Sequence, residues 1–184
     1  MPKHSNESAA APRAVRMRRA YFDCAFGQLH VRTAFPATGG FDEQMTLFCL
    51  HPQEGSSRSF DRFLPEIADV RSVYAPDLPG CGESDPPPNP TPGCAALAVA
   101  ELALDLRLRQ IDLLGLRSGG AAALELAASR PDLVRRVVLV NMPVMDPSPK
   151  VKQETLVLRT DHAAEAFEAA PRELARQIGA FLAR

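Results

Sequence analysis

Paired cysteines are absent from this sequence. Its four cysteines, Cys24, Cys49, Cys81 and Cys94, lie far apart, with no C-x-x-C pair and no spacing typical of metal ligands. This absence argues against a metal centre, so we expect no metal. Four reduced thiols of an intracellular protein explain the pattern best.

Long apolar runs and an excess of one charge are absent as well. No apolar stretch approaches the roughly 20 residues of a membrane-spanning helix. Residues 1–19 are polar and basic and lack the apolar core of a secretory signal, so we expect a disordered tail and a cytoplasmic protein. The 21 basic and 22 acidic residues leave a net charge of −1, which favours neither nucleic acid nor an anionic membrane as a partner.

The composition is that of one globular domain. Of the 184 residues, 46% are hydrophobic and 23% are charged, which is ordinary for such a chain. The length predicts a single domain over residues 20–184 that buries roughly 70% of the surface of the unfolded chain.

Apolar periodicity predicts strands that alternate with helices. Residues 21–33 are predicted to form a hairpin with its turn at Gly27. Further strands are expected at residues 45–50, 73–75, 111–114, 134–141 and 155–158, and helices at residues 56–70, 95–108, 118–129 and 172–183.

This order predicts an α/β fold, in which a mostly parallel sheet has helices on both faces and the hairpin at its N-terminal edge. In such sheets the ligand site lies beyond the carboxyl ends of the strands. Three loops that directly follow strands are therefore the candidates for function: residues 51–57, 76–85 and 115–120.

Three segments together resemble the α/β-hydrolase superfamily. LHPQEGSS at residues 50–57 is similar to the family's oxyanion loop, in which His-Gly follows a strand. APDLPGCGESD at residues 75–85 is similar to its Asp-(Leu/Tyr)-Pro-Gly-x-Gly-x-Ser turn, and LLGLRSGG at residues 113–120 is similar to its strand, nucleophile elbow and helix. The likeness covers about residues 21–142, and it implies the fold more strongly than any one activity.

The elbow carries arginine where the family has its attacking serine. The family pattern is Gly-x-nucleophile-x-Gly, because the turn is so tight that the two flanking positions must be small. Centring the pattern on Arg117 places Gly115 and Gly119 at those positions, whereas centring it on Ser118 places a leucine there. The resemblance therefore puts Arg117 at the nucleophile position, gives the backbone N–H of Ser118 to an oxyanion hole, and places Gly119 beside the ligand.

The oxyanion loop departs from the family pattern at Pro52, where glycine is usual. Proline has no N–H, so the resemblance assigns the second oxyanion donor to the backbone of Gln53. His51 precedes them in the loop and is expected beside the ligand, in a structural role more than a catalytic one.

The other triad groups have no direct match. The family's acid follows a late strand, which leaves Asp146 and Asp161 as candidates, although both are equally explained as solvated loop carboxylates. The family's histidine precedes the last helix, and aligning that helix leaves Ala164 in its place. His162, two residues away, is the remaining candidate for the base.

Two large elements of the family are missing from the pattern. Residues 142–152 are too few to form the helical lid that the family usually inserts there. The strand over residues 155–158 is followed almost at once by the last helix, so a late strand and its helix are also missing. We therefore expect a site open to water, which weakens electrostatic catalysis, and an exposed sheet edge prone to self-association.

These residues leave three functions open. The first is a cofactor-free hydrolase of a small ester, amide or carbonyl compound with a degenerate triad, in which Ser118 or an activated water attacks and His162 is the base. The second is a non-catalytic protein that binds a small anion. Its ligand would be a carboxylate or phosphate held by Arg117 at a helix N-terminus, where the permanently protonated guanidinium cannot attack but can bind. The third is an inactive deletion variant.

Overall fold

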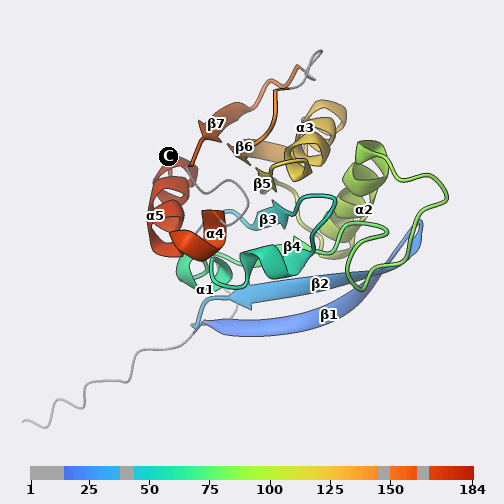
Figure 1. The fold of residues 1–184 in the computed structure, drawn as a ribbon, viewed down its shortest axis with the longest axis horizontal. Helices are drawn as coiled ribbons and strands as arrows, with labels where there is room; N and C mark the ends of the chain where they lie inside the picture. The colour runs from blue at the N-terminus through green and yellow to red at the C-terminus, as the bar shows by residue number, and fades with distance from the viewer. Residues whose placement is uncertain (1–14, 38–43, 145–149, 161–165) are drawn as a thin grey trace, which may run out of the picture.

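Seven strands form one sheet in the part of the chain that the structure describes (Figure 1). The structure is a computed structural model, and it describes residues 15–37, 44–144, 150–160 and 166–184. The strands are β1 (Arg16–Cys24), β2 (Gly27–Phe35), β3 (Leu47–Leu50), β4 (Val73–Pro76), β5 (Ile111–Leu116), β6 (Val134–Val140) and β7 (Glu154–Leu158).

The strand order is β1-β2-β4-β3-β5-β6-β7. The pairs β1–β2 and β2–β4 are antiparallel, whereas the pairs β4–β3, β3–β5, β5–β6 and β6–β7 are parallel. The mostly parallel sheet with an N-terminal hairpin edge that the sequence predicts is therefore confirmed.

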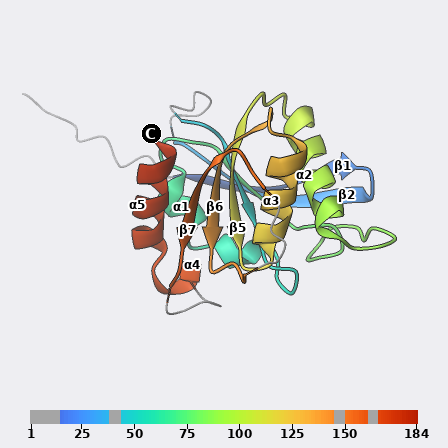
Figure 2. The same ribbon diagram turned by 90° about the horizontal axis from the view of Figure 1, so that it is seen from above.

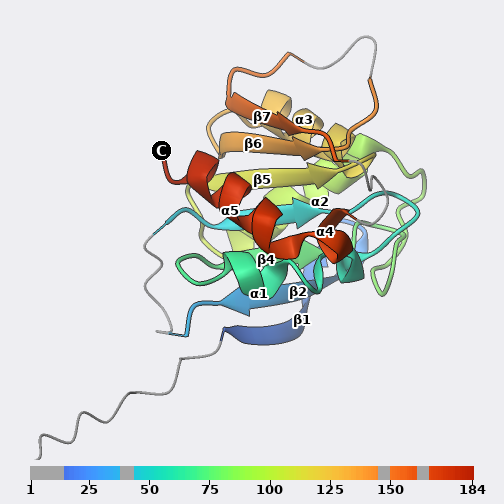
Figure 3. The ribbon, with the colours of Figure 1, turned by 60° about the vertical axis from the view of Figure 1, so that its left-hand side comes forward.

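Helices cover both faces of this sheet, as Figures 2 and 3 show from two directions. One face carries α2 (Pro92–Asp105) and α3 (Gly119–Ser129), and the other carries α1 (Leu64–Ile67), α4 (Ala166–Ala169) and α5 (Pro171–Leu182). Each face has its own buried apolar cluster, one built on α2 and α3 and the other on α1, α4 and α5. All six residues of β5 are buried, as expected for a central parallel strand that has helices on both sides.

The predicted disordered tail over residues 1–19 is wrong at its C-terminal end. β1 begins at Arg16, which pairs with Phe35, so residues 16–19 belong to the hairpin. Residues 1–14 lie outside the described part of the chain. The arginines that make this segment resemble a polar tail are exposed on an edge strand, where charged side chains discourage pairing with other chains.

The predicted helix over residues 56–70 is also wrong in extent. A 3-10 turn, η1 (Ser57–Phe60), comes first, and α1 follows as a separate helix of four residues. Pro65 lies at the start of α1 and has no N–H to donate to a preceding turn, so one continuous helix cannot form.

The connection between β6 and β7 contains no helix in its described residues, 141–144 and 150–153. β7 forms parallel pairs directly with β6, and it is the last strand at that edge of the sheet as described. No described helix is both long and apolar enough to cross a membrane.

Candidate active site

The turn between β5 and α3 places Arg117 in a strained backbone conformation. Arg117 has φ of +50°, which is uncommon for a residue with a side chain, whereas Ser118 has φ of −63°. Arg117 is thus the residue of this turn with the left-handed backbone conformation, and it is also the residue on which the family pattern is centred.

Two glycines make this turn sterically feasible, though by different contacts from those expected. A Cβ on Gly115 would lie 2.5 Å from the Cα of Gly120. A Cβ on Gly119 would collide with the backbone carbonyl oxygens of Leu50 and His51 at the end of β3. Gly119 is therefore required by the packing of α3 against β3, and not only by crowding against Gly115.

The Arg117 side chain contacts a neighbouring carboxylate. Its Nη2 lies 3.2 Å from Oε1 of Glu54, in the loop that follows β3. Both side chains are partly exposed, so the pair contributes little to stability. Arg117 is not among the residues that line the neighbouring pocket.

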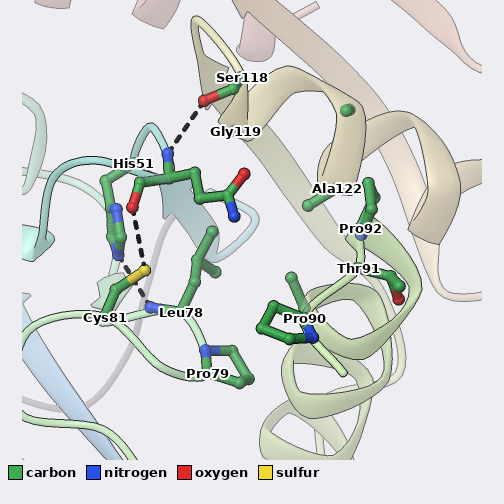
Figure 4. A pocket seen from close by; sticks show the side chains of 13 residues that line it. His51, Leu78, Pro79, Cys81, Pro90, Thr91, Pro92, Ser118, Gly119 and Ala122 are labelled. Atoms are coloured by element: carbon green, nitrogen blue, oxygen red, sulfur yellow. Dashed lines mark hydrogen bonds between the residues drawn. The ribbon is translucent and has the colours of Figure 1, made fainter. Parts of the chain in front are cut away.

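A hydrogen bond joins Gln53 to the side chain of Ser118. The backbone N–H of Gln53 donates a hydrogen bond of 2.9 Å to the Ser118 hydroxyl (Figure 4). The carbonyl of the same residue accepts from the thiol of Cys81 at 3.2 Å. No sequence pattern indicates this contact of Cys81, because its spacing to the other cysteines is uninformative and only the fold brings its turn beside Gln53.

His51 is fully buried and has a partner at each ring nitrogen. The backbone N–H of Leu78 donates to Nε2 at 2.8 Å, which assigns the proton to Nδ1, and Nδ1 lies 2.6 Å from the Pro52 carbonyl. Burial lowers the pKa of His51, and the Pro52 carbonyl and the charge of Asp77 only partly oppose this shift. His51 thus links the loops after β3 and β4, and its nitrogens are not free to act as a base.

The pKa of His51 predicts a pH dependence of stability. As the pH falls through 6.5, the ordinary pKa of the imidazole, the unfolded chain takes up a proton that the folded protein does not. The free energy of unfolding should therefore decrease with falling pH and level off above pH 6.5. Urea unfolding between pH 5 and 8, compared with His51→Gln, measures this. If the free energy of unfolding changed equally with pH in the two proteins, the prediction would be contradicted, since the other histidines are common to both.

Asp77 organises the turn after β4. Its Oδ2 accepts from Nδ1 of His30 and from the N–H of Glu83, both at 2.9 Å, and its Oδ1 accepts from the N–H of Ser57 at 2.6 Å. Burial raises the pKa of the Asp77 carboxyl, but hydrogen bonds from Ser57, Glu83 and His30 outweigh burial and leave the pKa below 3.8. These bonds give Asp77, the first residue of the Asp-Leu-Pro-Gly motif, a structural role.

A pocket of about 150 Å³ lies beside Gln53 and Ser118 (Figure 4). Its described walls come from the loops after β3 and β4 and from the N-terminal ends of α2 and α3. Leu78, Ala95 and Ala122 contribute apolar surface, and Gln53 and Ser118 contribute polar groups. The carboxyl ends of the strands thus border a pocket, where the α/β topology predicts a ligand site.

Three predicted candidates for the triad cannot be placed. His162, Asp146 and Asp161 lie outside the described residues, as does Ala164. The described residues contain no cluster of three histidine, cysteine or acidic side chains that could hold a metal ion.

Comparisons with known proteins identify the family. The sequence profile described as alpha/beta hydrolase fold matches residues 46–182. A curated relative, 2-hydroxymuconate semialdehyde hydrolase from Pseudomonas sp. (strain CF600), is 40% identical over 82 residues, which are 42% of this chain and 28% of the relative.

Solved structures agree with the profile. Cfl2 from Burkholderia cenocepacia matches with a TM-score of 0.63 and 26% identity, over 73% of this chain and 44% of that one. A hydrolase from Pseudomonas aeruginosa PA01 matches with a TM-score of 0.60 and 28% identity, over 68% of this chain and 46% of that one. This chain therefore spans less than half the length of each of these relatives. By its match to the profile and its likeness to these solved structures, it belongs to the alpha/beta hydrolase fold family.

Proposed function

We propose that this protein hydrolyses a small ester, amide or carbonyl compound with a degenerate triad, and that Ser118 supplies the nucleophile. One observation carries the proposal: the Ser118 hydroxyl and the Gln53 N–H lie 2.9 Å apart at the wall of a pocket. A nucleophile and an oxyanion donor must both lie within reach of one carbonyl group, and this pair meets that requirement.

The reaction uses the Gln53 N–H differently before and after substrate binds. In the ligand-free protein this N–H donates to Ser118 Oγ. When Ser118 Oγ attacks the carbonyl carbon, the Gln53 N–H and the Ser118 N–H both donate hydrogen bonds to the developing oxyanion. The proton of the hydroxyl goes to a base, for which His162 is the candidate. The tetrahedral adduct then collapses: its C–O or C–N bond breaks, and the alcohol or amine leaves with the proton that the base returns. Water finally hydrolyses the acyl–serine ester, which releases the acid and restores the Ser118 hydroxyl.

The contacts of Arg117 do not support the alternative function, in which its guanidinium binds a small anion. Its guanidinium already faces the carboxylate of Glu54, and its side chain is not part of the pocket wall. A small carboxylate would have to displace an internal one to reach it.

An active-site serine probe tests the proposal. A fluorophosphonate should label the wild-type protein at Ser118, and Ser118→Ala should show neither labelling nor ester turnover. A Ser118→Ala variant that is labelled, or that turns over esters as fast as wild type, would remove Ser118 as nucleophile.

The same assay on Arg117→Ser asks whether the elbow position itself can be restored. If the remaining machinery is in place, Arg117→Ser should raise ester turnover at least 10-fold over wild type, whereas Arg117→Ala should not. Equal turnover in these two variants would show that the residue at position 117 does not limit the reaction.

A further inference from the structure

We propose that the pocket beside Gln53 selects an uncharged group about the size of one benzene ring, attached to the carbonyl of the ligand. This inference rests on the proposed function only for where the carbonyl lies. It adds the chemical class of the group that the carbonyl carries, and it applies whether or not the bound compound is hydrolysed.

The charge of the group follows from the pocket wall. None of the residues that the structure describes in this wall is aspartate, glutamate, lysine or arginine. The imidazole of His51 is neutral, because its Nε2 accepts from Leu78 and burial lowers its pKa. An ionised group that entered between these walls would lose hydration without meeting a counter-ion among the described lining residues, which makes its entry unfavourable.

The size of the group follows from two alanines that face the pocket from different helices. Ala95 belongs to α2 and Ala122 to α3, and both are almost completely buried by their neighbours. With Leu78 and Pro90 they line a space of about 150 Å³. An engineered protein cavity of about 150 Å³ with apolar walls holds benzene. One ring, or an alkyl chain of similar volume, therefore fills the pocket.

The polar groups of the site then fix the orientation of the ligand. Gln53 and Ser118 lie at one wall of the pocket (Figure 4). A ligand that places its carbonyl oxygen against the Gln53 N–H can direct its apolar group between α2 and α3. Benzamide has both features: it is uncharged, and it carries one ring on a carbonyl group.

Four probes separate charge from size. Binding of benzamide, 2-naphthamide, hexanamide and succinamate to the full chain is measured by ligand-observed NMR titration, and repeated on Ser118→Ala so that turnover plays no part. Hexanamide and succinamate carry groups of similar size on the carboxamide, but only the group of succinamate is charged. We expect benzamide and hexanamide to bind at millimolar concentration, and 2-naphthamide and succinamate to bind at least 10-fold more weakly. Succinamate binding as tightly as hexanamide, 2-naphthamide binding as tightly as benzamide, or the absence of benzamide binding would overturn the inference.

Substitutions that fill the pocket test whether the ring of benzamide binds there. Ala122→Leu should weaken benzamide binding at least 10-fold, while Ala128→Leu, the same change at an exposed position of α3, should leave it unchanged. Thermal unfolding shows whether Ala122→Leu folds. If it does not, Ala95→Leu, which fills the pocket from α2, replaces it in the binding measurement. Unchanged binding in a folded Ala122→Leu or Ala95→Leu variant would refute the site. Benzamide binding without ester turnover would instead refute the proposed hydrolysis and leave this inference intact.

Discussion

Gly119→Ala should destabilise the protein by about 3 kcal/mol or more, a cost at the upper end for overpacking a core. The added methyl group would collide with the carbonyl oxygens of Leu50 and His51. These are backbone atoms at the end of β3, so they cannot rotate away as the tip of a side chain can. Relief requires α3 to move from the sheet, which would also separate Ser118 from Gln53.

Gly179→Ala is the matched control for this variant. Gly179 lies inside α5, and the nearest atom to its added Cβ would be Cδ1 of Ile67 at 3.6 Å, an ordinary contact. Alanine there should stabilise the protein by roughly 0.5–1 kcal/mol, because glycine is a poor helix former. Urea unfolding followed by circular dichroism measures both. A Gly119→Ala variant as stable as wild type would show that β3 and α3 are not packed as closely as the structure indicates.

The architecture could be predicted from the sequence because each element carries a local signal. β5 is a short run of largely apolar residues, and α3 begins with two glycines and continues as a run rich in alanine and leucine. Order and spacing then fix a parallel sheet, since strands separated by helices rarely pair otherwise. The predicted extent was wrong for two elements whose local signal is misleading. The edge strand that begins at Arg16 is rich in arginine, and the predicted helix over residues 56–70 is interrupted at Pro65.

The sequence predicts which loops border the candidate site, but not the contacts that their side chains make. The loops that carry Gln53 and Ser118 lie side by side because they leave adjacent parallel strands. The bond from the Gln53 N–H to the Ser118 hydroxyl is a side-chain contact that the motif positions do not predict. The partners of Arg117 and Cys81 depend on side-chain directions across loops, for which the sequence has no periodic signal. This is why Arg117 was a plausible anion-binding residue in the sequence, yet has an internal carboxylate partner in the fold.

Asp112→Asn should also cost about 3 kcal/mol or more, at the end of the sheet away from the pocket. Asp112 is fully buried at the start of β5 and accepts two hydrogen bonds from Arg135, at 2.9 and 2.7 Å. Nη1 of Arg71, a residue only 1% exposed, lies 3.6 Å from the same carboxylate. Removing one charge from a buried group of this kind leaves the other charges uncompensated, which is strongly destabilising.

The loss of Asp112 should also weaken the attachment of α5. Arg135 and Arg136 both donate to the carbonyl of Leu182 at the end of that helix, at 2.7 and 3.1 Å, and Asp112 holds Arg135 in position. Hydrogen exchange of the α5 amides should therefore accelerate in Asp112→Asn more than exchange in α3.

Asp132→Asn is the control for charge, because Asp132 forms a two-bond pair with Arg130 on the surface. Screening by water makes the contribution of such an exposed pair to stability small. Urea unfolding of the two variants compares the same chemical change in two environments. If Asp112→Asn cost no more than Asp132→Asn, the buried carboxylate would not be what joins β5, β6 and α5, and the stability of that end would have to come from its apolar packing alone.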